Sequence, residues 1–475
     1  MGPLLVRLQR ACGLGGDQAR GRGAPGLAAS SAGGADAAVN DPAVDLMATG
    51  LSHTQHETAL ARSPATGTLC AGYNDTYHLI TEDRGFSGFS RSLDGGLSWL
   101  DGGALGEGSG GGPSLVWRQT DGRFYYAALH TDGVGLWRSN DDCASFLFAG
   151  LVHSGTSDDK ARLVADNHPA SPGFGRLYLV FTDFSNGRIF ATSSADGGAG
   201  WSAPVAISAA GVVVQSAWPA VAPNGDLFVA YTRWQSFPAG PITIEIARSA
   251  NGAASFSPAS PPLASGAVPR DAGATASCGR AALAGNLRYL PAAQLAAADD
   301  GALHVVYSYD PDGQDSGDVV DVFYRRSLDG GATWSPQLRV NDDGGSRDQF
   351  SPALALGGNR LITISWYDRR LDPGNLLVDR YARQSLDGGL SFGPGTRLSE
   401  VSSPIRLDPE LPSCFHGDYD QQVAGPGHVV YLWSDDRNIQ DGHRDADVYG
   451  DRLEAPLFGD GFESGGISAW SFSLP

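Results

Sequence analysis

Three arginines stand in successive repeats of this chain and could grip one anionic group. Arg233 follows an aromatic strand-like segment, and Arg288 and Arg347 each precede a segment of small residues in the next two repeats. Guanidinium groups bind carboxylates in a bidentate fashion, so three of them brought to one point would clamp an anion. Tyr419 or Tyr367 could stand beside such a clamp.

Three carboxylates come from repeats on the other side of the predicted ring. Asp75, Glu57 and Asp159 could act as general acid or base if they meet the arginines. The alternative is that these carboxylates cap loops and pair with neighbouring arginines in a solvated ring. Residue types and phase alone leave both interpretations open.

A repeated pair of strands must position these residues. Each repeat holds a small-residue strand, a Gly-containing turn and an alternating aromatic strand, as in Pro219–Ala222 followed by Leu227–Tyr231. The first strand runs away from one face and the second returns, so the start of one and the end of the other share a rim. The polar residues at this phase are Asn74, Asp75, His130, Asp183, Arg233, Asp310, Asp368, Arg369, Arg370, Asp435, Asp436 and Arg437 at the ends, and Glu57, Asp159, Lys160, Trp218, Arg288, Tyr289, Arg347, Asp348, Asp418 and Tyr419 at the starts. This ring predicts a polar-ligand site at one mouth of a central channel.

A second motif, S-x-D-x-G-x-[ST]-[WF], occurs six times and is called the box below. Three copies are complete and begin at Ser92, Ser327 and Ser385, whereas three degenerate copies begin at Ser139, Ser194 and Ser249. The Asp accepts turn amides, the Gly permits positive φ, and the hydroxyl closes a bond to the turn. We expect each box to brace a hairpin and its final aromatic residue to pack inward. The box carboxylates are therefore structural candidates and not catalytic ones.

The repeats predict an all-β fold, a seven-bladed β-propeller of four-stranded antiparallel blades with box hairpins. Repeat starts fall near residues 57, 113, 160, 218, 290, 351 and 417, so seven repeats face six boxes, and six blades is the alternative. The last unit has only three strands, and the segment 43–49 could supply its fourth and close the ring. We expect a disordered leader over 1–42, the propeller over 43–454 and a short extension over 455–475.

The composition excludes several classes of partner. Asp and Glu outnumber Lys and Arg by 52 to 33, a net charge of −19, which opposes nucleic-acid binding and repels anionic membranes. The chain contains no apolar run of 18 residues that could span a bilayer, and its first apolar stretch is cut short at Arg7, so a signal peptide is not demonstrated. We expect a monomer.

The sequence indicates no metal and no cofactor. Its five cysteines, Cys12, Cys70, Cys143, Cys278 and Cys414, are far apart and include no C-x-x-C. One disulfide of unreadable pairing is an alternative to five buried thiols. The stretch 310–315 is rich in Asp like a calcium loop, but it lacks the terminal Glu and is better interpreted as an ordinary loop.

Over residues 45–453, the boxes and their strand pairs resemble those of the bacterial neuraminidase repeat proteins, the superfamily that contains the exo-sialidases. The resemblance implies a bacterial, exported propeller, extracellular or periplasmic, with a glycan ligand at the channel mouth. A sialidase of this superfamily needs three arginines on the substrate carboxylate, a tyrosine nucleophile paired with a Glu, and an Asp as acid and base. Strand phase alone offers Arg233, Arg288 and Arg347, with Tyr419 or Tyr367 and the three carboxylates, for these roles. The Arg-Ile-Pro or Arg-Leu-Pro tripeptide typical of sialidases is absent near the start, where Arg62-Ser63-Pro64 stands.

These observations support two main hypotheses about function. The first is a sialidase-like glycoside hydrolase, an exo-α-sialidase or a relative, that binds and cleaves glycans at the channel mouth. The second is a non-catalytic propeller that binds a glycan or a protein there. A purely structural surface module is a third hypothesis, which the polar ring disfavours.

Overall fold

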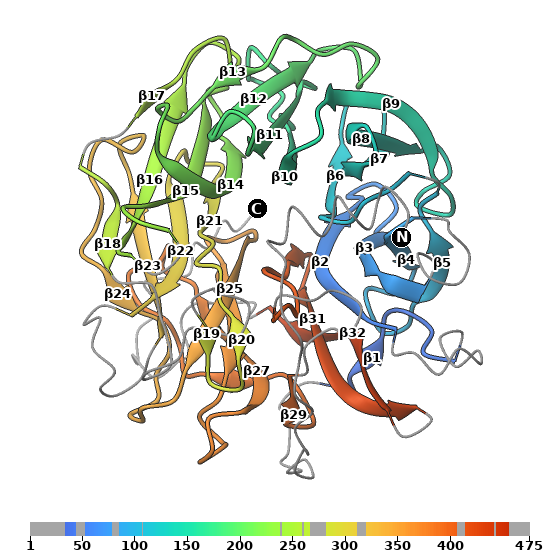
Figure 1. Cartoon of the computed structure of the whole chain (residues 1–475), viewed down its shortest axis with the longest axis vertical. Coiled ribbons are helices and arrows are strands. Elements are labelled where there is room, and N and C mark those ends of the chain that lie inside the picture. Colours follow the sequence, from blue (N-terminus) through green and yellow to red (C-terminus); the bar gives the residue numbers. More distant parts are fainter. Residues whose placement is uncertain are drawn as a thin grey trace, which may run out of the picture.

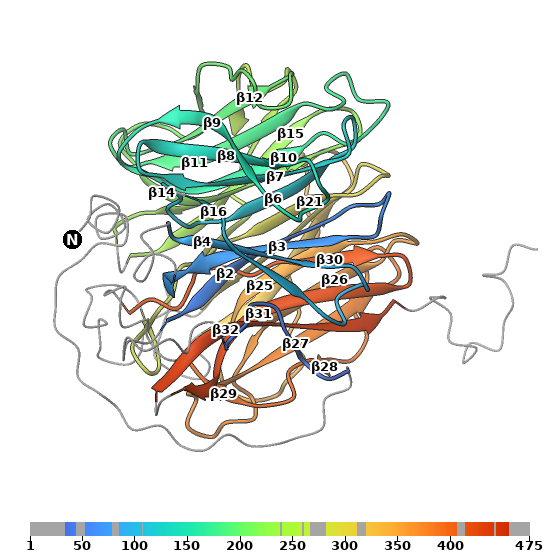
Figure 2. The same ribbon diagram turned by 90° about the vertical axis from the view of Figure 1, so that its right-hand side faces the viewer.

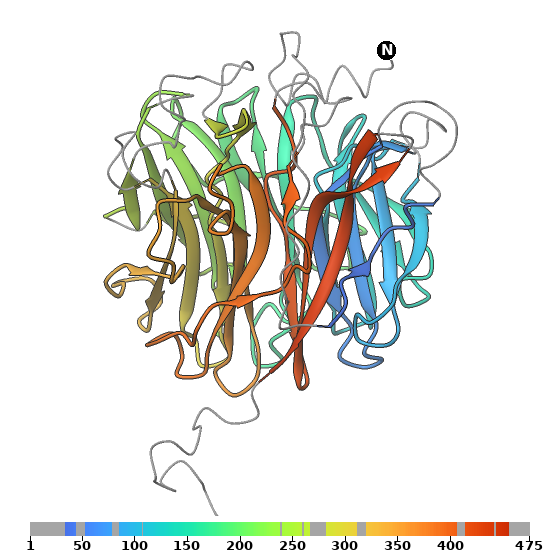
Figure 3. The ribbon, with the colours of Figure 1, turned by 90° about the horizontal axis from the view of Figure 1, so that it is seen from below.

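The computed structural model describes residues 34–43, 53–77, 85–106, 108–237, 240–258, 261–266, 282–310, 320–405, 414–440 and 443–455. They form a seven-bladed β-propeller, in which seven antiparallel sheets surround a central axis (Figure 1). Seen from the side, the strands run between the two faces of the ring (Figure 2, Figure 3). The structure therefore confirms seven blades and excludes six.

Each blade begins at the axis and proceeds outward along the chain. Blade I is β2 (Gln55–Arg62), β3 (Leu69–Asp75), β4 (Ser87–Ser92) and β5 (Leu100–Ala104), and blade II is β6 (Ser114–Arg118), β7 (Arg123–His130), β8 (Gly133–Ser139) and β9 (Leu147–Ser154). Blade III is β10 (Asp158–Ala165), β11 (Leu177–Asp183), β12 (Arg188–Ser194) and β13 (Val205–Ala206), and blade IV is β14 (Val213–Val221), β15 (Leu227–Trp234), β16 (Ile242–Ser249) and β17 (Ser257–Pro258), with β18 (Ala264–Gly266) also on β16.

The remaining blades continue the same order. A hairpin of β19 (Ala282–Leu283) and β20 (Leu287–Arg288) precedes blade V, which is β21 (Gln294–Ala297), β22 (Leu303–Tyr309), β23 (Asp321–Ser327) and β24 (Leu338–Arg339). Blade VI is β25 (Gln349–Leu356), β26 (Ile362–Asp368), β27 (Leu377–Ser385) and β28 (Thr396–Arg397), with β29 (Ser403–Pro404) also on β27. Blade VII is β30 (Gln422–Gly425), β31 (His428–Gln440), β32 (His443–Glu454) and, from the other end of the chain, β1 (Ala37–Ala38).

The hydrophobic core is divided among the seven interfaces between neighbouring blades. Seven separate clusters of buried side chains occur, and each draws its members from two consecutive blades. The cluster around Leu60, Tyr73 and Leu432 joins blade VII to blade I and completes the ring. Because both faces of a blade are covered, its middle strands are buried along their whole length, as in β3, β11 and β26.

Blade VII closes with a strand from the N-terminal part of the chain. Ala37 pairs with Gly450 and Ala38 with Tyr449, and Asn40 fixes the seam through bonds to Asp447 and the backbone of Val448. The prediction of a closing N-terminal strand is thus confirmed, but its position was wrong: Ala43 lies in a turn, and 44–49 lie outside the described residues. Residues 34–42, which the sequence assigned to a disordered leader, belong to the fold. The rest of that leader, 1–33, and the extension 456–475 also lie outside the described residues.

All six boxes form the same hydrogen-bonded turn between the third and fourth strands. In the first, Ser92 Oγ donates to Asp94, and Asp94 accepts from the backbone and hydroxyl of Ser98 at 3.0 and 2.5 Å. The degenerate copies keep the backbone bond: Asp196 accepts from the Gly200 amide at 2.9 Å, and Asn251 Oδ1 accepts from the Ser255 amide at 3.0 Å. Gly200 supplies no hydroxyl for the second bond. The box residues are therefore structural, as predicted.

The final aromatic residue of each box packs into the interface with the preceding blade. Trp99 of blade I joins the cluster shared with blade VII, and Phe146 of blade II joins the cluster shared with blade I. The same direction holds for Trp201, Phe256, Trp334 and Phe392. Each box thus braces its own hairpin and also fastens its blade to the one before it.

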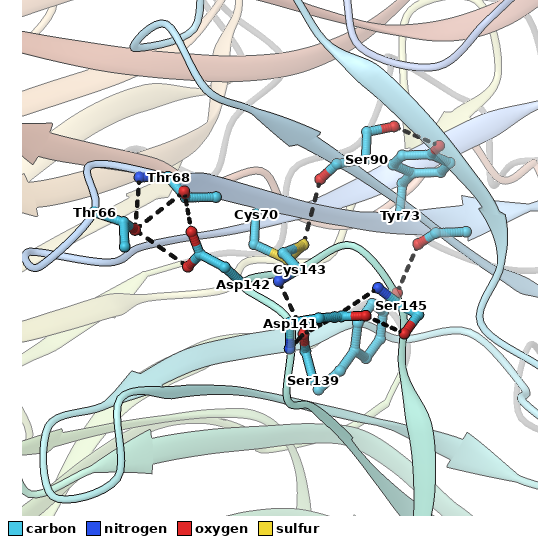
Figure 4. The surroundings of a disulfide bond; sticks show 12 residues. Thr66, Thr68, Cys70, Tyr73, Ser90, Ser139, Asp141, Asp142, Cys143 and Ser145 are labelled. Atoms are coloured by element: carbon cyan, nitrogen blue, oxygen red, sulfur yellow. Dashed lines mark hydrogen bonds between the residues drawn. A yellow bond between two sulfur atoms is a disulfide. The ribbon is translucent and has the colours of Figure 1, made fainter.

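A disulfide reinforces the interface between blades I and II (Figure 4). Cys143 takes the place of a box glycine, with φ of 66°, and bonds to Cys70 on β3 of the preceding blade. The neighbouring Asp142 accepts hydrogen bonds from Thr66 and Thr68 at 3.2 and 2.5 Å. The sequence allowed one disulfide, and the structure identifies its two partners.

Candidate functional site

Four inner strands carry the same β-bulge where they approach one mouth of the channel. The register of β2, β10, β14 and β25 shifts there, and the bulges contain the left-handed residues Glu57 (φ 57°), Lys160 (φ 51°), Ser216 (φ 62°) and Ser351 (φ 48°). A non-glycine residue in this conformation costs about 1–2 kcal/mol, and such strain concentrates at functional sites. A bulge also re-aims the side chains of its strand. The mouth formed by these strand starts is called the bulge mouth below.

A buried lysine lies at the centre of the bulge mouth. Lys160 Nζ contacts Glu57 Oε1 at 2.5 Å and Asp418 Oδ2 at 2.6 Å, although the three residues come from blades III, I and the approach to blade VII. Arg288 Nη2 contacts the same Asp418 oxygen at 2.7 Å. Burial alone would raise the pKa of Asp418, but Arg288 and Lys160 hold it well below its usual range. Asp418 is therefore an anion held between two cations.

Asp159 is buried beside this cluster. Its Oδ2 accepts from Gln215 Nε2 at 2.5 Å, and its Oδ1 accepts from the backbone of Lys160 at 2.9 Å. Burial raises the pKa of Asp159, and the charge of Lys160 only partly opposes that rise. Of the carboxyls around Lys160, Asp159 thus has a raised pKa where Asp418 has a lowered one.

Tyr419 is held by a cation and a backbone oxygen. The Arg162 guanidinium carbon stands 3.3 Å from the centre of the Tyr419 ring and 4.4 Å from that of Trp218. Both Tyr419 Oη and Arg162 Nη1 donate to Pro113 O, at 3.2 and 2.8 Å. Burial raises the pKa of Tyr419 well above 10 despite Arg162, so its hydroxyl stays protonated.

Four cations and four acids form a set of buried side chains at the bulge mouth. A further pair, Arg380 and Asp420 at 3.4 Å, is tied to blade I through Thr58 Oγ1, which donates to Asp420 at 3.1 Å. The buried residues that make up this set are the cations Lys160, Arg162, Arg288 and Arg380 and the acids Glu57, Asp159, Asp418 and Asp420. When all eight groups are ionised, the four charges of each sign cancel, which offsets part of the desolvation cost.

A small cavity lies against this set. Its volume is about 20 Å³, and its lining includes Glu57, Arg288, His416 and Asp418. Such a volume holds one water molecule. Asp418 Oδ1 is buried and has no hydrogen-bond partner, so it is the atom such a water would satisfy.

The structure brings together four of the seven predicted site residues. Glu57, Asp159, Arg288 and Tyr419 meet around Lys160 and Arg162. The other three predicted residues lie apart from this group.

Arg233, Arg347 and Asp75 do not join this group. Arg233 Nε pairs with Glu245 on the adjacent strand at 3.0 Å, and Arg347 is half-buried outside the cavity lining. Asp75 accepts from Gln55 Nε2 at 3.1 Å and from the backbone of Tyr77 at 3.0 Å. The expected convergence of three arginines is therefore not found, because a cross-strand carboxylate holds Arg233.

Several residues at the bulge mouth were not predicted as site residues from the sequence. Lys160, Asp418 and Trp218 were in the predicted ring but had no assigned role, whereas Arg162, Gln215, Asp420 and Arg380 were outside it. Arg162, Trp218 and Tyr419 all stand two residues after a left-handed position, at Lys160, Ser216 and Gly417. This common offset is a signal that a search by phase could have used.

Exposed aromatic rings stand on the rim of the same mouth. Phe184 follows the end of β11 and is 41% exposed, and Phe237 follows the end of β15 on the next blade and is 42% exposed.

The described residues offer no site for a metal ion, since no three of their His, Cys, Asp or Glu side chains gather together. Asp310 is buried, and 311–315 of the Asp-rich stretch lie outside the described residues. No described helix is long and apolar enough to cross a membrane.

No protein-family model and no curated protein matches the chain. Among solved structures, a Dyadobacter fermentans protein of unknown function is similar over 90% of this chain and 98% of its own, with 11% identity and a TM-score of 0.45. A leech intramolecular trans-sialidase is similar over 66% and 64%, with 11% identity and a TM-score of 0.45. An α-L-arabinofuranosidase of Fusarium graminearum is similar over 89% and 98%, with 11% identity and a TM-score of 0.43.

Proposed function

We propose that this chain is a glycan-binding propeller that holds its ligand at the bulge mouth and does not cleave it through a tyrosine nucleophile. The observation that carries the proposal is the state of Tyr419. Its hydroxyl donates to a backbone oxygen, its ring is covered by Arg162, and its pKa lies well above 10. A nucleophilic tyrosine needs a base at its hydroxyl, and Pro113 O is not one.

The buried charges are already paired within the protein, which argues against a clamp for a sugar carboxylate. Lys160 is shared by Glu57 and Asp418, and Arg288 is already paired with Asp418. A sugar carboxylate would have to displace an internal partner to reach either cation, at a cost of several kcal/mol for the buried charge left behind. We therefore assign the cluster the task of holding seven blades in one geometry beneath the ligand.

The rim supplies the contacts that a sugar needs. Phe184 and Phe237 expose apolar faces on neighbouring blades, and Arg233 presents a part-exposed guanidinium between them in the chain. Sugar rings carry apolar C–H faces bordered by hydroxyls, so aromatic faces beside a few polar groups are suited to them. A protein partner is the alternative occupant of the same rim.

A direct test compares ligand capture with turnover. We expect the protein to bind members of an immobilised glycan array and to lose that binding when Phe184 and Phe237 are both replaced by alanine. Phe174, which is 38% exposed elsewhere on blade III, is the matched control for losing an exposed ring. Binding that survives the double substitution would refute the rim. Release of the fluorophore from an aryl sialoside would refute the absence of turnover.

One observation favours hydrolysis as the second candidate function. Asp159 combines a raised pKa with a place beside Glu57 and Lys160, as a general acid requires. Hydrolysis that vanishes in Asp159→Asn but persists in Tyr419→Phe would assign the role of acid to Asp159.

We also propose that the protein belongs among the exported sialidase-like propellers that its boxes resemble, and that it works outside the cytoplasm as a monomer. The Cys70–Cys143 disulfide supports this location, since disulfides persist in oxidising compartments. Fractionation of the expressing cell would test it, and a cytoplasmic protein with reduced thiols would count against it.

A further inference from the structure

A second cavity opens at the opposite end of the channel, on the side of the boxes. Its volume is about 930 Å³, against about 20 Å³ at the bulge mouth. It is lined by the far ends of the inner strands of blades V, VI and VII, together with Arg62 and Pro64 of blade I. We call it the box groove. A cavity of this size accommodates a ligand of several sugar units.

Three arginines line the box groove without carboxylate partners. Arg62 ends β2, Arg326 stands on β23, and Arg360 lies in the turn before β26. Among the described residues, none of the three forms an ion pair. Their free charge is therefore available to a ligand.

Contacts with one box turn hold two of these arginines together. Arg326 Nη1 donates to Gly388 O at 2.6 Å, and a Cβ placed on Gly388 would lie 2.6 Å from Arg360 Nη2. On the facing wall, Arg62 Nε lies 3.1 Å from a Cβ placed on Gly425 of blade VII. Because Gly388 and Gly425 carry no side chain, the arginine side chains can approach the backbone closely at both positions.

His304 lies in the wall of the groove. Burial, and then the charges of Arg326 and Arg360, lower the pKa of His304 to about 4, although Asp300 opposes them. His304 is therefore neutral at pH 7 and leaves the cationic character to the arginines. The two carboxylates of the lining, Asp299 and Asp300, are exposed, and Asp300 caps its own turn through the amide of Ala302.

We propose that the box groove binds a carboxylated oligosaccharide. Planar carboxylates match the fork of a guanidinium, and the apolar floor formed by Leu356, Leu361, Ala424 and Pro426 suits the C–H faces of sugar rings. An acidic peptide fits less well, because its backbone would need an open strand edge and the groove is lined by strand ends and turns. The site is separate from the bulge mouth and does not depend on the function proposed there.

The test uses the full chain and trigalacturonate as the probe. We expect titration calorimetry at low salt to show binding that weakens as salt is raised, and no binding of the matched neutral trisaccharide, galactotriose. Arg62→Ala and Arg360→Ala should each weaken binding by roughly tenfold to a hundredfold, as the loss of a charge-assisted hydrogen bond does. Arg360 is exposed, so its replacement leaves the fold intact.

Arg123→Ala is the matched control, since Arg123 is a part-exposed arginine at the same end of blade II outside the groove. The control should bind trigalacturonate as the parent does. Equal binding of the neutral trisaccharide, undiminished binding by the Arg62→Ala, Arg360→Ala double variant, or failure of the parent to bind would each overturn the proposal. Loss of glycan capture at the bulge mouth in the phenylalanine variants, with trigalacturonate binding retained, would separate the two sites.

Discussion

Removing the Cys70–Cys143 disulfide should loosen the interface between blades I and II. The two cysteines are 73 residues apart, and cross-linking a loop of this length lowers the entropy of the unfolded chain by an amount equivalent to about 4 kcal/mol at 25 °C. Chains of this length unfold with an entropy change of roughly 1 kcal/mol per kelvin, so the loss corresponds to about 4 °C in Tm.

The variant that tests this is Cys70→Ala with Cys143→Gly. Glycine restores the residue that complete boxes carry, and it takes the φ of 66° at position 143 without strain. Both cysteine side chains are buried in the cluster between the blades, so truncation adds a packing loss of about 1 kcal/mol at each site. Calorimetry should therefore place the Tm of the double variant 5–8 °C below that of the parent, as an order-of-magnitude expectation.

A reductant provides the control for this experiment. When unfolding is measured with the reductant present, the Tm of the parent should fall toward that of the variant, and the Tm of the variant should not change. A variant that unfolds at the same temperature as the oxidised parent would refute the reasoning, because it would mean that blades I and II stay together whether or not the chain is cross-linked.

Three further predictions follow from the charges and the boxes. Replacing Lys160 by Met should lower the unfolding free energy by about 3–5 kcal/mol, because two buried carboxylates lose their cation, and Lys160→Arg should recover part of it; equal Tm values for parent and Met variant would contradict this. Asn251→Asp should stabilise the fourth box by roughly 0.5–1 kcal/mol at pH 7, measured by urea denaturation, and an unchanged midpoint would show that the amide already does the whole task. Hydrogen bonds from their box hydroxyls and amides lower the pKa of Asp329 and Asp387 to about 2 from 3.8, so the contribution of these two carboxylates to the Tm should be level from pH 7 to 5 and be lost between pH 4 and 2 as they are protonated. The Tm of a double Asn variant should fall less steeply between pH 4 and 2 than that of the parent.

Much of the fold could be predicted because the chain repeats itself. The repeated strand pairs predict seven blades. Because only six boxes accompany them, one blade must obtain its outer strand in another way. The closing strand itself was placed six residues too late. Ala37–Ala38 is a two-residue strand inside a Gly- and Ala-rich stretch, so no alternation marks it.

The position of a residue along its strand predicted which mouth its side chain lies at, but not which side chains it contacts there. Phase put Glu57, Asp159 and Tyr419 at one mouth, and the structure agrees with that placement. It could not foresee that Glu57 and Lys160 adopt left-handed conformations, because neither is a glycine. The bulges change the direction of the side chains on their strands, and the side chain of Lys160 therefore lies at the centre of the cluster.

Partner choice across a sheet was the other missing information. Arg233 lies opposite Thr243, and Glu245 is two residues further along the same strand. A long side chain reaches this diagonal neighbour easily, and the resulting ion pair keeps Arg233 from the other arginines. Register must be known before such a competition can be judged.

The pairing of β1 with β32 also governs the order in which this protein can be made. The ribosome delivers Ala37 and Ala38 first and their partners Tyr449 and Gly450 some 400 residues later, about 20 to 80 seconds apart at ordinary rates of synthesis. During that interval blade VII is not yet available to pack against blade I, so the hydrophobic cluster between these two blades lacks the residues of blade VII. A nascent chain of six blades is thus an open arc with two apolar ends, and the need to shield those ends lasts until the final strand emerges.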